Sequence, residues 1–102
     1  MKALRERDIE RRLVERVEQL GGEIRKVKWI NRHGAPDRLV LLPAVDTMGP
    51  AGVIPAKQLW IELKATGKVA EEHQQREHDR MRSFGLQVEV VDSFERVDAI
   101  LR

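Results

Sequence analysis

Apolar residues recur at a helical spacing near the start of the chain. They follow one another at intervals of four, four and three, with charged residues between them: Ile9, Leu13, Val17 and Leu20. This pattern predicts an amphipathic helix over residues 4–20. Two glycines at 21–22 end the helix.

Three apolar segments after this helix predict strands, and they cover residues 23–30, 37–42 and 59–63. The second (DRLVLL) and the third (LWIEL) are nearly continuous apolar runs, which are typical of strands buried on both faces. We therefore expect these two strands at the centre of a sheet. The segment 31–36 (NRHGAP) is dense in turn-forming residues and predicts a turn before Asp37.

The second half of the chain predicts a helix, a strand and a short last helix. The helix at 67–84 is expected to end at Gly85, a C-terminal cap, and has four residues near one stripe: Ala70, Gln74, Met81 and Phe84. A strand is expected at 86–91 (LQVEVV). Ser93 is expected to cap a last helix that runs to Leu101.

This order, α-β-β-β-α-β-α, predicts an α/β fold in a single domain over residues 1–102. The first three strands can form an antiparallel meander, and the helix at 67–84 supplies the crossover that a parallel fourth strand needs. We expect a mixed sheet flanked by helices. Residues 43–57 are rich in Pro and Gly and look too irregular for a ladder, so they predict a flexible hairpin extension.

Composition narrows the chemistry available to the protein. Its 102 residues include no Cys, no Tyr, two Trp and two Phe. Thiolate zinc sites, cysteine nucleophiles and most base-stacking platforms are therefore excluded. No apolar run approaches the roughly 18 residues of a membrane span, and the charged N-terminus does not resemble a secretory signal. We expect a cytoplasmic protein with no membrane partner.

The net charge of +2 conceals an uneven distribution of cations. Between positions 25 and 38, Asp37 is the one acidic residue, against five basic residues: Arg25, Lys26, Lys28, Arg32 and Arg38. We call these five residues the cationic strip. Such a strip attracts polyanions and predicts a phosphate-bearing partner.

Asp37, Glu62 and Lys64 are the first candidates for chemistry. Glu62 and Lys64 stand two apart at the end of an apolar strand, so their side chains point to the same face. Pro36 suits a strand entry and sets the direction of Asp37, so the two carboxylates can converge. Close carboxylates repel each other unless they share a hard divalent cation, and a lysine beside that ion can orient water or offset phosphate charge. The structural alternatives are a simple Glu62–Lys64 ion pair and a turn-capping Asp37.

Two further polar residues occupy positions that an apolar residue would suit better. Glu10 lies at the border of the inward stripe of the first helix, where a solvated glutamate is the plainer explanation. Gln74 lies two turns before Met81 on one helix face, as either a buried hydrogen-bonded amide or a site residue. The histidines lack a metal-ligand spacing and are expected to be solvated or to cap helices: His33, His73 and His78.

The order and spacing of these residues resemble the VRR-NUC domain of the PD-(D/E)xK nuclease superfamily. The matching segments are GAPD at 34–37, IELKA at 61–65, Gln74 eleven residues before Gly85, and a preceding helix with Glu10. The resemblance covers nearly the whole chain and is to the stand-alone forms of phages and bacteria. It implies a restriction-endonuclease-like sheet. The insertion at 43–57 is longer than a minimal member needs and leaves the substrate preference open.

The resemblance also implies an activity: a divalent-metal-dependent DNA endonuclease, acting as a homodimer on branched DNA such as four-way junctions. The implied ligands of Mg²⁺ or Mn²⁺ are Asp37, Glu62 and the backbone carbonyl of Leu63. Lys64 would position or activate water, Gln74 would support the site, and Glu10 would be an outer acidic member.

Two other functions stay open at this point. One is a non-catalytic nucleic-acid-binding module that uses the cationic strip. The other is a protein-interaction domain whose charged helices are solvated surface. Metal-dependent cleavage separates an enzyme from both, and the salt dependence of DNA binding separates the two from each other.

Overall fold

The computed structural model describes residues 3–101, and a four-stranded sheet forms its centre. The strands lie in the order β1 (Glu23–Lys26), β2 (Arg38–Leu42), β5 (Lys57–Leu63), β6 (Val88–Val91). The first three strands are antiparallel neighbours, and β6 pairs with β5 in parallel. This topology confirms the predicted mixed sheet, with β2 and β5 in the middle.

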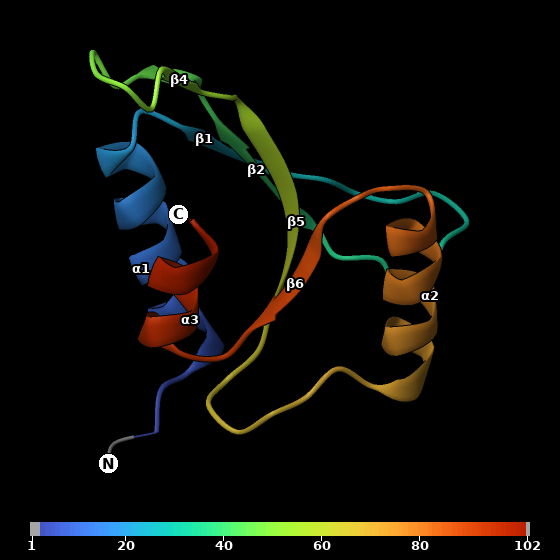
Figure 1. Cartoon of the computed structure of the whole chain (residues 1–102). Helices are drawn as coiled ribbons and strands as arrows, with labels where there is room; N and C mark the ends of the chain where they lie inside the picture. The colour runs from blue at the N-terminus through green and yellow to red at the C-terminus, as the bar shows by residue number, and fades with distance from the viewer. Residues whose placement is uncertain (1–2, 102) are drawn as a thin grey trace.

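One face of the sheet carries the hydrophobic core. Helix α1 (Glu6–Gln19) and helix α3 (Phe94–Ile100) cover this face together (Figure 1). The buried residues of α1 are Ile9, Leu13 and Val17, as the spacing predicts, and they meet alternate residues of β5: Leu59, Ile61 and Leu63. Ser93 caps α3 as expected, because its Oγ accepts the Arg96 N–H over 3.1 Å.

Helix α2 (Glu72–Ser83) lies on the opposite side of the sheet from α1 and α3 (Figure 1). It begins five residues later than the predicted helix, because residues 65–68 form a turn in which Lys68 N–H binds the carbonyl of Ala65. Phe84 does not belong to its buried stripe: the helix ends just before it, and Phe84 is 78% exposed. Met81 is buried as predicted.

The segment 43–57 is more regular than its composition predicts. Two short strands, β3 (Val45–Asp46) and β4 (Val53–Ile54), pair antiparallel in a separate two-stranded sheet. The expectation of no ladder here was wrong, because the prolines at 43, 50 and 55 lie outside both strands and so remove no ladder hydrogen bond. Thr47 closes the hairpin by bonding the Gly52 carbonyl through both N–H and Oγ.

Two predicted strands are shorter in the structure. The strand expected at 23–30 ends at Lys26, although Val27 N–H still bonds the carbonyl of Asp37. The strand expected at 86–91 begins at Val88, because Leu86 N–H bonds back to Met81 and belongs to the exit from α2. Within residues 3–101, no helix is both long enough and apolar enough to cross a bilayer.

Candidate active site between the sheet and α2

Strand register brings Asp37 and Glu62 face to face. Arg38 of β2 pairs with Ile61 of β5, so the next positions outward are Asp37 and Glu62. Directly opposed residues of antiparallel strands project to the same face of a sheet. The side chain of Asp37 is 61% exposed and that of Glu62 is 15% exposed. The predicted convergence of the two carboxylates is therefore built into the pairing of β2 with β5.

Of these two residues, Glu62 is the one whose ionised form is disfavoured by its surroundings. Its pKa is raised to about 7, chiefly by burial; the charge of Lys64 opposes this rise, and the charges of Asp37 and Glu6 contribute to it. A carboxyl group with this pKa is largely protonated just below neutral pH. The site thus lacks enough positive charge to keep Glu62 ionised by protein groups alone.

The backbone next to Asp37 is held by a tryptophan. Trp29 donates a hydrogen bond from Nε1 to the carbonyl of Pro36 over 2.8 Å, and its ring lies 5.0 Å from that of Trp60. Pro36 is buried, and Asp37 O accepts Val27 N–H over 2.9 Å. The main chain at Asp37 is therefore fixed while its carboxylate faces solvent.

Gly34 lets the turn before Asp37 pack directly on α2. Its φ is +83°, and a Cβ atom there would lie 2.9 Å from the carbonyl oxygen of His73 and 3.0 Å from Cα of Gln74. Only glycine fits such an approach without a shift of backbone. Arg32 strengthens the contact through a 3.4 Å ion pair with Glu77.

Lys64 and Gln74 meet across the gap between β5 and α2. Lys64 Nζ donates to Gln74 Oε1 over 2.8 Å, and the same oxygen accepts the N–H of Glu71 over 2.8 Å. The lysine backbone is fixed as well, because its N–H bonds the carbonyl of Val91. The structure thus brings together Asp37, Glu62, Lys64 and Gln74, four of the five side chains expected in the catalytic set.

Glu10, the fifth, reaches the site through Arg38. Arg38 Nε lies 2.6 Å from Glu10 Oε2, and its Nη1 lies 2.8 Å from Asp37 Oδ1. The Arg38 side chain is only 14% exposed. Burial opposes its charge, but the hydrogen bond to Glu10 and the nearby Asp37 carboxylate raise the pKa of Arg38 on balance. Arg38 therefore bridges two carboxylates, and its charge is compensated within the protein.

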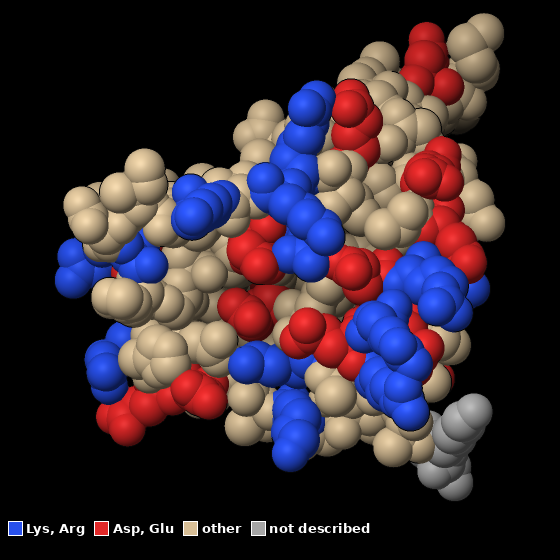
Figure 2. Space-filling model, turned by 180° about the vertical axis from the view of Figure 1, so that it is seen from behind, with Lys and Arg blue, Asp and Glu red and all other residues tan. Residues whose placement is uncertain are grey.

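The other four residues of the cationic strip lie on the surface. Arg25 pairs with Glu23 over 3.1 Å, and Arg32 is half-exposed beside Glu77. Lys26 and Lys28 are exposed and form no ion pair within residues 3–101. Figure 2 shows acidic side chains in the middle of the face opposite to the view of Figure 1, with Lys and Arg side chains around them. An anionic centre with a basic surround suits a metal ion beneath a polyanion.

His78 is a residue whose role the sequence prediction missed. It is 1% exposed, so it is neither solvated nor a helix cap, and its Nε2 lies 3.6 Å from Glu62 Oε1. The signal was available: His78 stands four residues after Gln74 and three before Met81, on the same helix face. His33 and His73 are exposed, as expected.

The oxygen donors present fit Mg²⁺ or Mn²⁺. Asp37 and Glu62 supply carboxylates, and the carbonyl of Leu63 belongs to the residue between Glu62 and Lys64. No group of three His, Asp or Glu side chains suited to a metal ion occurs among the described residues. Two carboxylates nevertheless suffice for Mg²⁺, which usually keeps several waters and adds substrate phosphates to one or two protein carboxylates. The raised pKa of Glu62 also indicates that a bound cation would stabilise its ionised form.

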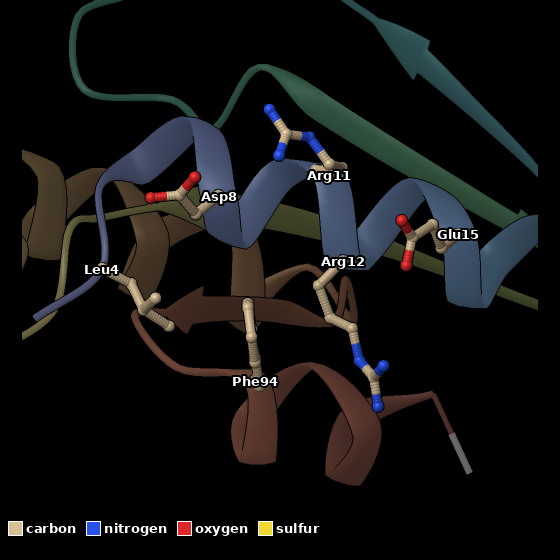
Figure 3. A pocket seen from close by; sticks show the side chains of 6 residues that line it. All are labelled: Leu4, Asp8, Arg11, Arg12, Glu15 and Phe94. Carbon is tan, nitrogen blue, oxygen red and sulfur yellow. The ribbon is translucent and has the colours of Figure 1, made fainter. Parts of the chain in front are cut away.

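A separate hollow of about 230 Å³ lies between α1 and α3 and contains none of these site residues (Figure 3). Arg12 extends across it, with its guanidinium 5.7 Å from the ring centre of Phe94 and a 2.9 Å ion pair to Asp98. This cation therefore joins α1 to α3.

Comparisons with known proteins identify the family to which this fold belongs. No family model matches the sequence. A protein of Acyrthosiphon pisum secondary endosymbiont phage 1, described as "Putative nuclease p44", is 39% identical over 93 residues, which cover 91% of this chain and 88% of the phage protein. A solved structure described as a VRR_NUC domain has a TM-score of 0.75 and 37% identity, and the match covers 94% of this chain and 92% of that one. The chain therefore belongs to the VRR-NUC nuclease family.

Proposed function

We propose that this nuclease is a divalent-metal-dependent endodeoxyribonuclease of the PD-(D/E)xK type. The observation that carries the proposal is the juxtaposition of Asp37 with Glu62 across β2 and β5, with Lys64 anchored beside them by Gln74. Two carboxylates can hold a divalent ion, such an ion can assist the hydrolysis of a phosphodiester, and a nearby lysine can offset phosphate charge.

Asp37, Glu62 and the Leu63 carbonyl would hold Mg²⁺ or Mn²⁺. When bound, the ion would lower the pKa of a coordinated water and offset the charge of the scissile phosphate. The 15% exposure of the Glu62 side chain limits the access of bulk water to this edge of the site. Asp37, at 61% exposure, marks the side from which a phosphate would approach.

Lys64 would orient the attacking water or contact a phosphate oxygen. Its ammonium has three donors, and the hydrogen bond to Gln74 occupies one of them. Gln74 is in turn held by the N–H of Glu71 at the start of α2, so the lysine is anchored by a helix terminus. Glu10 would hold Arg38 through one ion pair, and Arg38 would hold Asp37 in position through a second.

DNA is the proposed substrate, and Lys26 and Lys28 are the main proposed phosphate contacts. Both are exposed and unpaired within residues 3–101: Lys26 ends β1, and Lys28 lies in the segment that leads from β1 to the turn before Asp37. Arg25 and Arg32 add partly compensated charge. We also propose that the protein acts in the cytoplasm of a bacterial or phage-infected cell, where it would meet such DNA.

Branched DNA cut by a homodimer is the finer part of this proposal. One site cuts one strand, so symmetric resolution of a four-way junction requires two sites related by a two-fold axis. We expect a dimer in light scattering and paired cuts on junctions. A strict monomer that cuts linear duplex as well as junctions would leave a general nuclease.

The test is cleavage of labelled linear, flapped and four-way-junction DNA with Mg²⁺, Mn²⁺ or a chelator. Asp37→Asn and Lys64→Ala are expected to abolish cleavage while retaining the fold. Asp46→Asn, in the hairpin, and Lys68→Ala serve as matched controls and are expected to cut like the parent. DNA binding without cleavage under any metal condition would instead identify a non-catalytic binding module.

A further inference from the structure

His78 is buried on the inward face of α2 with one ring nitrogen lacking a partner. Its side chain is 1% exposed, and Nε2 forms no hydrogen bond in the structure. The nearest carboxylate oxygen recorded is Oε1 of Glu62, at 3.6 Å. Buried polar atoms almost always have partners, so an unpaired nitrogen that faces a site carboxylate requires an explanation.

The position of Nε2 beside Glu62 indicates which ring nitrogen carries the proton. A neutral imidazole has one N–H donor and one acceptor. Beside an ionised carboxylate, which is the form that binds a metal ion, a ring nitrogen is favourable only when it carries the proton.

We propose that His78 is a positioning residue for the metal-binding carboxylate: its Nε2–H holds Glu62 Oε1 and leaves the other oxygen for the ion. This inference rests on the proposed function of the site. His78 itself is too buried to touch DNA, so it acts through Glu62 alone. A movement of about 0.4 Å closes the observed separation to an ordinary hydrogen bond.

Packing alone is a weak reason for a histidine here. Met81, three residues later on the same helix face, is a buried apolar side chain, so an apolar residue suits this face of α2. Gln74, four residues earlier, already supports Lys64. Along this one face, Gln74 would fix the lysine and His78 would fix the glutamate, so α2 would orient both side chains that β5 contributes.

The experiment compares His78→Leu, which fills the space without a donor, with His78→Gln, which retains an N–H donor. Calorimetric Mn²⁺ titration without DNA gives the metal affinity, and steady-state cleavage gives kcat and KM. His78→Leu is expected to lose about 10- to 100-fold in Mn²⁺ affinity and in kcat, as outer partners of metal ligands typically do. The KM for DNA is expected to stay unchanged, and His78→Gln is expected to recover most of the loss.

Equal losses in the two variants would overturn the inference, because they would indicate packing, and so would a folded His78→Leu protein with the parent's affinity and kcat. If His78→Leu does not fold, long-range ¹H–¹⁵N NMR of the metal-free parent at alkaline pH decides. The proton is expected on Nε2, with a shift in Glu62→Gln, and a proton on Nδ1 alone would contradict it. A parent that binds Mn²⁺ but cuts no DNA would contradict the proposed function and leave the His78 comparison intact.

Discussion

Lys64 and Gln74 are joined by a 2.8 Å hydrogen bond between the end of β5 and the first turn of α2. The same Gln74 oxygen accepts the N–H of Glu71, so one amide both begins the helix and anchors the lysine. The start of α2 and the position of the candidate catalytic ammonium are therefore coupled.

Gln74→Ala is expected to reduce both the stability of the protein and the rate of cleavage. Loss of the oxygen that accepts Glu71 N–H should cost about 1 kcal/mol of folding free energy. Release of Lys64 should reduce kcat by roughly 10- to 100-fold, because a displacement of about 1 Å at a catalytic group has effects of this size. Gln75→Ala is the control, since the Gln75 side chain bonds the Ala70 carbonyl and the backbone bond from its N–H to Glu71 remains in the variant. Cleavage should fall in the first variant and persist in the second.

The raised pKa of Glu62 predicts a pH-dependent stability for the metal-free protein. The unfolded carboxyl titrates near 4.5 and the folded one near 7, so the folded state binds the proton more tightly between these values. Stability should therefore fall as pH rises from 4.5 through 7, by up to about 3 kcal/mol. Glu62→Gln lacks this titration.

Urea unfolding of parent and Glu62→Gln, with chelator present, measures the effect at acidic and mildly alkaline pH. The two proteins should be similar in acid, and the variant should be the more stable one in alkali. A constant difference across the range would show that Glu62 titrates normally.

Gly34→Ala should damage both the fold and the site. The substitution forces alanine into a left-handed conformation and brings Cβ within 3.0 Å of the α2 backbone. Gly67→Ala is a matched control, since its φ is +82° and nothing lies within 4 Å of its Cβ position. The control should lose about 1 to 2 kcal/mol from backbone strain alone. Gly34→Ala should lose more and should also cut DNA more slowly, because the turn that carries Asp37 must move away from Gln74.

Divalent metal should stabilise the native protein through the same carboxylates. Ligand at ten times its Kd adds about 1.4 kcal/mol to the unfolding free energy, which is a rise of several degrees in Tm for a domain of this size. Glu62→Gln should abolish most of the rise measured with Mn²⁺ by calorimetry. An equal rise in both proteins would place the ion at another site.

Lys26→Ala/Lys28→Ala should weaken DNA binding in a salt-dependent way. Each phosphate contact contributes about −0.9 to the slope of log K against log salt, so the double variant should flatten the slope by nearly two. Arg11→Ala/Arg96→Ala removes the same charge on the side of α1 and α3 and should leave the slope near that of the parent. Binding would be measured by titration over a range of KCl concentrations.

Local sequence patterns predicted the parts of the fold that depend on neighbouring residues. The apolar spacing of α1 and the continuous runs of β2 and β5 are such patterns, and they placed Asp37 and Glu62 at adjoining strand ends. The hairpin at 43–57 was predicted, but its two-stranded ladder was not, because the composition of the whole segment does not show that the prolines lie outside the paired positions. The late start of α2 was missed as well, because it follows from the turn at 65–68 and from the bond by which Gln74 caps the N–H of Glu71.

Arg38 shows why the electrostatics of the site were harder to predict. In the sequence it belongs to a run of cations, which favours a surface role. In the fold its partner Glu10 lies 28 residues away on α1, and the pairing exists only after the helix docks on the sheet. His78 is similar: its spacing on α2 indicates the inward face, but its position 3.6 Å from Glu62 of β5 exists only after α2 packs on the sheet.

The paired tryptophans have a practical consequence. Trp29 and Trp60 are the only two in the sequence, and their rings lie 5.0 Å apart at an interplanar angle of 48°. Trp29 is bonded to the residue before Asp37, and Trp60 stands two positions before Glu62 on β5. All of the chain's indole fluorescence therefore originates next to the two carboxylates, and a paramagnetic ion such as Mn²⁺ held there would quench it, so the two indoles provide an intrinsic optical test of the proposed metal site.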